Sequence, residues 1–131
     1  MSIFESTVNI NKPAAEVYRF LADFNNHREL MPEGISDWSS DNDSALFTFQ
    51  GMARLSMKIS DRQENQSVLI VPNQQVPFPI QIEWNLSAEG AGSRVHLKLS
   101  AELNMMMKMM ASAPLNKLVN AQTEKLQGLL K

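Results

Sequence analysis

The sequence predicts an α+β fold in which a curved antiparallel sheet of about seven strands wraps around a long C-terminal helix. Apolar and polar residues alternate near the N-terminus and along consecutive runs between residues 34 and 104. From Met105 onward the spacing of apolar residues becomes helical. A sheet with one apolar face and a single long helix bury both surfaces most simply when the sheet wraps around the helix.

The chain has the size and composition of one globular domain, and we expect residues 1–131 to form it. Its 131 residues are 44% hydrophobic, which suffices for one core. The absence of cysteine excludes disulfides and thiolate chemistry. A net charge of -2 and a pI of about 5.6 argue against nucleic acid as a partner. There is no signal-peptide pattern and no long apolar run, so we expect a cytoplasmic protein without an integral membrane segment.

The N-terminal elements follow from the residue pattern. Residues 4–10 alternate in polarity, which predicts a half-buried strand whose inner side includes Ser6. Apolar residues at positions 17, 20, 21 and 24 predict an amphipathic helix that Asn11 caps, that Pro13 begins and that ends near residues 23–25. A short helix of one turn follows it, before Pro32.

The middle of the chain predicts a meander of strands separated by short polar breaks. The clearest hairpin pairs residues 80–86 with 95–101, because both runs alternate perfectly across a turn that contains glycine. The ionisable side chains of these strands take the outward parity and should meet water. Inward parity is predicted for Phe47, Phe49, Leu55, Met57, Ile59, Leu69, Val71, Ile80, Ile82, Trp84, Leu86, Val95, Leu97 and Leu99.

The longest predicted element is the C-terminal helix. Its apolar side holds Leu115, Leu118, Val119, Gln122, Leu126, Leu129 and Leu130. Pro114 lies inside it and removes one backbone donor, so either the helix is kinked there or a shorter segment precedes the main helix.

Short motifs near the start of the chain, together with the order of elements, resemble a known superfamily. The motifs are Val8-x-Ile10-x-x-Pro13-x-x-x-Val17-x-x-x-Leu21-x-Asp23 and Leu30-Met31-Pro32, and the paired final strands and the helix at 114–130 complete the pattern. In these respects the whole chain resembles the SRPBCC or START-like superfamily, the helix-grip fold of polyketide cyclase/dehydrase-like and pollen-allergen-like proteins. The resemblance implies a deep, mostly apolar cavity between sheet and long helix, used in other members for lipids, polyketides, hormones and quinones. A fold implies no single reaction.

We predict that the protein binds or carries a small apolar molecule in this cavity without catalysis, because almost nothing on the predicted inner face can ionise. A polyketide cyclase/dehydratase-like enzyme and a protein–protein interaction module are the alternatives. No catalytic residue, cofactor or metal site is predicted. The candidates for lining the cavity are Phe20, Phe24, Met31, Phe47, Phe49, Met57, Trp84, Leu97, Met106 and Met110.

The few polar candidates are weak evidence for an enzyme. His27 is the main titratable candidate near the cavity entrance, and Tyr18 or Ser6 are the groups that would assist it. A lone histidine without a second positioned group rarely indicates catalysis. His96 has outward parity, and two histidines do not make a metal-binding cluster.

Five methionines crowd into residues 105–110 and have two interpretations. Methionine is unbranched and polarizable, so the cluster either fills the core or repacks around apolar ligands or partners. We therefore expect this region to be the contact site if a protein partner binds or a homodimer forms, with Phe78 as a further contact residue.

Overall fold

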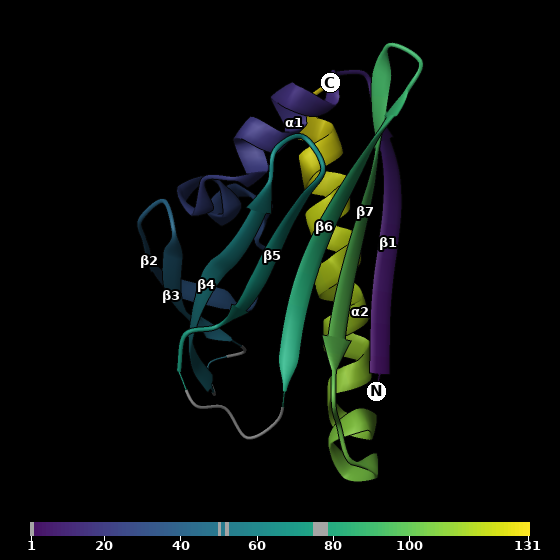
Figure 1. The fold of residues 1–131 in the computed structure, drawn as a ribbon. Coiled ribbons are helices and arrows are strands. Elements are labelled where there is room, and N and C mark those ends of the chain that lie inside the picture. Colours follow the sequence, from purple (N-terminus) through teal and green to yellow (C-terminus); the bar gives the residue numbers. More distant parts are fainter. Residues whose placement is uncertain (1, 50, 52, 75–78) are drawn as a thin grey trace.

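The computed structural model describes residues 2–49, 51, 53–74 and 79–131 and has the predicted helix-grip architecture (Figure 1). Phe78, one of the expected contact residues, lies outside the described residues. The elements are β1 (Ser2–Ile10), α1 (Ala14–Leu21), the 3₁₀ helix η1 (Phe24–Leu30), β2 (Ile35–Ser40), β3 (Ser44–Phe49), β4 (Ala53–Gln63), β5 (Ser67–Pro72), β6 (Ile80–Glu89), β7 (Gly92–Ala101) and α2 (Met105–Leu129).

The strands form one antiparallel sheet of seven strands in the order β1-β7-β6-β5-β4-β3-β2. From β2 to β7, strands that follow one another along the chain are paired, which is the predicted meander. Strand β1 pairs with β7 over its whole length. The predicted hairpin of β6 and β7 is confirmed. In Figure 1, α2 runs lengthwise beside β6, β7 and β1.

The first helix differs from the prediction at both ends. α1 has Pro13 as its N-cap and no side-chain cap, so the predicted capping role of Asn11 is wrong. The helix ends at Leu21 because a separate 3₁₀ helix starts three residues later. The Asp23 side chain caps that second segment by accepting a hydrogen bond of 3.0 Å from the backbone N–H of Asn25.

Strand β5 presents the face opposite to the predicted one. Val68 and Ile70 are buried, whereas Leu69 and Val71 are only half-buried. Val68 lies directly opposite Trp84 of β6, whose side chain is in the core. Residues 68–71 are all apolar, so alternation carries no information here, and the pairing with β6 decides which side chains face inward.

The long helix α2 is continuous from Met105 to Leu129 with Pro114 inside it, so no separate shorter segment precedes the main helix. Asn104 caps it by accepting a hydrogen bond of 2.9 Å from the backbone N–H of Met107. Its buried side holds Leu115, Leu118, Val119, Gln122, Thr123 and Leu126. Leu129, predicted to lie on that side, is 47% exposed because it falls in the last turn.

The sheet and α2 are joined by polar as well as apolar contacts. The inward orientation predicted for Ser6 is confirmed, since its hydroxyl lies 2.7 Å from the hydroxyl of Thr123 in α2. The outward orientation of His96 is also confirmed, because its Nε2 lies 2.8 Å from Oε1 of Glu5. The parity of the strands therefore separates the core from most ionisable groups.

Gly92, at the start of β7, gives a test of how tightly β7 packs against the end of β1. A Cβ atom there would collide with the backbone oxygen of Ile10. We expect Gly92→Ala to lower the free energy of unfolding by about 1–3 kcal/mol, measured by urea denaturation. Gly128 in α2 has open space around its Cα, so Gly128→Ala should instead raise stability by about 1 kcal/mol. Equal stability of the two variants would contradict this packing.

Candidate functional site

A cavity of about 40 Å³ lies between the middle of α2, η1 and the inner face of strands β2 to β6. It is larger than the roughly 10–15 Å³ that a single water requires, and far smaller than the roughly 300–1,000 Å³ of a typical ligand pocket. Its walls are formed by Phe24, His27, Met31, Ile35, Phe47, Met57, Ile70, Ile82, Trp84, Leu118 and Gln122.

The structure brings half of the predicted lining residues together at this cavity. Phe24, Met31, Phe47, Met57 and Trp84 all form part of its wall. Three others lie elsewhere in the core: Leu97 is fully buried in β7, and Phe20 and Phe49 are half-buried against the main cluster.

Met106 and Met110, also expected to line the cavity, lie on the surface, with 72% and 71% of their area exposed. They belong to the first two turns of α2, which extend past the N-terminal end of β1 in Figure 1. Helical spacing turns them away from the buried side, and the cavity is reached only further along α2, by Leu118 and Gln122.

Sequence reasoning missed several lining residues for different reasons. The alternation predicts the correct face for Ile82 but does not distinguish it from the other inward residues, and it predicts the wrong face for Ile70 of β5. Gln122 could have been predicted from the sequence. It is an amide on the otherwise apolar side of a helix, and burying an amide is costly unless it forms a hydrogen bond. His27 was expected at an entrance, whereas it is 1% exposed.

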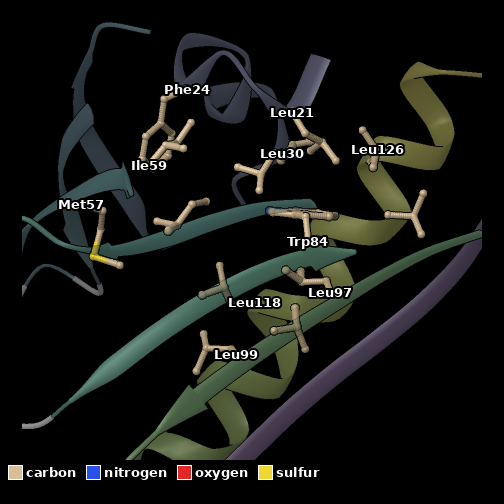
Figure 2. Packing of buried hydrophobic residues seen from close by; sticks show 14 of the residues in the cluster. Leu21, Phe24, Leu30, Met57, Ile59, Trp84, Leu97, Leu99, Leu118 and Leu126 are labelled. Atoms are coloured by element: carbon tan, nitrogen blue, oxygen red, sulfur yellow. The ribbon is translucent and has the colours of Figure 1, made fainter. Parts of the chain in front are cut away.

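Trp84 is the central residue of the cavity wall. Its side chain is fully buried, and Figure 2 shows Leu21, Leu97 and Leu126 pointing toward its ring from three different elements. The indole nitrogen lies at the end of the ring that points toward Met57 and away from Leu126. This N–H has no hydrogen-bond acceptor among the described residues.

His27 is a buried, neutral ring in the same wall. Its ring meets that of Phe24 edge-on at 4.8 Å between centroids, and that of Trp84 at 6.1 Å. Burial lowers the pKa of His27 to about 4, against smaller raising effects of its hydrogen bond to Leu21 and of the Asp23 charge. Because Nε2 lies 2.8 Å from the carbonyl oxygen of Leu21, the neutral ring carries its proton on Nε2 and a lone pair on Nδ1.

A second, outer groove of about 190 Å³ adjoins the cavity and is lined by Arg28, Met31, Ile35, Ser36, Asp37 and Trp38. The cavity and the groove share Met31 and Ile35, which therefore form the partition between them. Two hydrogen bonds link Met31 to α2. Lys125 Nζ donates to its backbone oxygen at 2.8 Å, and Gln122 Nε2 donates to its sulfur at 3.5 Å.

Within the described part of the chain, no group of three His, Asp or Glu side chains is arranged to hold a metal ion. Among the same residues, no helix has both the length and the apolar character needed to cross a membrane.

Solved structures share this fold over nearly the whole chain. A START superfamily protein from Mycobacterium smegmatis aligns with a TM-score of 0.71 at 15% identity, covering 98% of this chain and 96% of that one. The Aha1 dimer from Colwellia psychrerythraea gives 0.74 at 16% identity, with 99% and 96% covered. XoxI from Bacillus cereus gives 0.76 at 12% identity, with 99% and 96% covered. The protein therefore has a START-like, helix-grip fold.

A family model assigns the chain to one family among proteins with this fold. The model described as polyketide cyclase / dehydrase and lipid transport matches residues 10–123, and the chain belongs to that family. The match includes every described residue that lines the cavity, from Phe24 of η1 to Gln122 of α2. No curated protein sequence matches this chain.

The buried His27 predicts a specific loss of stability in acid. Its pKa of about 4 lies below the unfolded value of 6.5, so the unfolded chain binds more protons between these two pH values. Its contribution to stability is therefore complete above pH 6.5 and falls by about 3 kcal/mol as pH drops through this window. We expect His27→Gln, which keeps a donor for Leu21, to flatten the pH dependence measured by urea denaturation at pH 4.5–7.5.

His96→Gln is the matched control, because His96 lies on the outer face. An unchanged pH profile in His27→Gln would show that His27 is not buried in its neutral form.

Proposed function

We propose that this protein, as one START-like domain of residues 1–131, holds a small apolar molecule in the cavity between its sheet and α2 without transforming it. The observation that carries the proposal is the composition of the cavity wall. Eight of its eleven described side chains are aliphatic, phenyl or thioether groups, and the remaining three are His27, Trp84 and Gln122. Such a wall favours apolar molecules through the hydrophobic effect and offers few groups for chemistry. A cytoplasmic location remains a prediction.

Binding without catalysis is favoured over the cyclase/dehydratase alternative by the titratable groups. His27 is the one ionisable side chain among the described lining residues. A general base works best with a pKa near the operating pH, whereas burial lowers the pKa of His27 to about 4. Ser6 is paired with Thr123 and lies outside the cavity wall, and Tyr18 is also outside it.

The small volume of the cavity requires that its wall move when a molecule enters. Met31 and Met57 are the side chains suited to this, because unbranched thioethers change rotamer easily. Met31 also stands in the partition with the outer groove, so its displacement would open a path from the surface. Entry past Met31 and Ile35 is part of the proposal.

The test is to purify the protein from its own host and record its native mass spectrum. We expect a 1:1 complex with a small apolar molecule that organic extraction releases. In Ile70→Phe the added ring occupies the cavity, so the extra mass should be lost. Leu69→Phe adds a comparable ring on the opposite face of the same strand and should keep it.

The proposal fails if wild-type protein is consistently free of bound molecules. It also fails if the two phenylalanine variants behave alike, since only Ile70 lines the cavity.

The second candidate function is self-association through the exposed methionines of α2. Met105, Met106, Met109 and Met110 are 71–81% exposed and together form an apolar stripe, here called the methionine stripe. The structurally similar Aha1 protein is described as a dimer, which supports a second copy of this chain as the partner.

Light scattering coupled to gel filtration tests this stripe. We expect wild-type protein to be dimeric at high concentration and Met106→Lys/Met110→Lys to be monomeric, because burying two unpaired lysines at an interface is unfavourable. Ser87→Lys/Ala91→Lys adds the same charge at two exposed positions, near the end of β6 and in the β6–β7 turn, and should leave the dimer intact. A monomeric wild-type protein would exclude self-association.

A further inference from the structure

The cavity wall contains a hydrogen-bond donor that lacks an acceptor. Trp84 is fully buried, and its Nε1 has no partner within the described residues. The other indole behaves normally, because Trp38 Nε1 donates to Ser40 Oγ at 3.0 Å. Buried donors in folded proteins are almost always paired, so an unpaired one next to a cavity points to an acceptor supplied from outside the chain.

A second donor in the same wall is only weakly satisfied. Gln122 is 4% exposed, and its Nε2 donates to the sulfur of Met31 at 3.5 Å. A thioether is a poor acceptor, so an oxygen in the cavity would compete with it readily. The Trp84 indole can only donate, whereas the Gln122 amide can donate or accept, so a molecule that accepts hydrogen bonds can be bound by both side chains.

The wall also limits the charge of that molecule. No carboxylate, lysine or arginine is among the described lining residues, and His27 is neutral near pH 7. A charged group in this cavity would have no counter-ion, which is far more costly than burying a neutral oxygen that is hydrogen-bonded.

We propose that the cavity takes a neutral, mainly apolar molecule carrying one acceptor oxygen, such as a ketone or ester carbonyl, and that the N–H of Trp84 binds this oxygen. The inference rests on the proposed function, and it adds the class of ligand. The carbonyl would be aligned along the indole edge that points toward Met57.

The test uses two probes of the same shape, cyclopentanone and methylenecyclopentane, which differ only in carbonyl oxygen against methylene. Their dissociation constants are measured by NMR titration of wild-type protein and of Trp84→Phe. We expect the preference for the ketone over the alkene to fall roughly tenfold in Trp84→Phe, as for loss of one buried hydrogen bond. The ratio cancels both the desolvation of the ketone and the space that the smaller ring creates. Trp38→Phe, which removes an indole that is already paired, should leave the preference unchanged.

A second measurement needs no variant at the cavity. The indole N–H resonance of Trp84, assigned by its persistence in Trp38→Phe, should move on adding the ketone and much less on adding the alkene. If Trp84→Phe does not fold, this resonance decides the question.

Three results separate the inference from the proposed function. If both probes bind and neither the ratio nor the resonance depends on the carbonyl, the inference is overturned and the apolar cavity stands. If a permanently bound water accepts the hydrogen bond of Trp84, the indole resonance does not move when the ketone is added, and the inference is likewise overturned. If neither probe binds, the cavity admits no small apolar molecule, and both proposals fall.

Discussion

The burial of Trp84 is the constraint on which the rest of the structure depends. Its ring occupies the inner face of β6 near the middle of the sheet, opposite Val68 of β5 and Leu97 of β7. A fully buried indole needs cover from the other side, and α1, η1 and α2 supply it (Figure 2). The same large side chain that anchors the core also forms part of the cavity wall. The packing of the core and the lining of the site therefore share this residue.

This arrangement explains why the site is suited to holding rather than transforming a molecule. The ionisable side chains of the strands point outward, as in the His96–Glu5 pair. His27, the ionisable side chain among the described residues that line the cavity, is neutral near pH 7 because burial lowers its pKa to about 4. The polar groups that remain in the cavity wall are neutral and include the N–H donors of Trp84 and Gln122, which select by hydrogen bonding without supplying acid or base.

Much of the fold was predictable because alternation and helical spacing record which side of each element is buried. The β6–β7 hairpin and the inward Ser6 are examples. The pattern failed where it carried no information, as in the wholly apolar residues 68–71, whose face is set by pairing with β6. The prediction for Met106 and Met110 was wrong for another reason: helical spacing turns both away from Leu118 and Gln122, and the start of α2 does not reach the cavity. The cavity itself depends on how three elements meet, which no local pattern encodes.

The most direct measurement of the central claim is a crystal structure of the protein purified from its own host, with no ligand added. We predict continuous electron density for a non-protein molecule between Trp84 and Leu118, with Met31 displaced from its position in the partition. A cavity that stays near 40 Å³ and holds nothing but water, with Met31 in place, would contradict the claim. The helix-grip fold would then enclose only its own core.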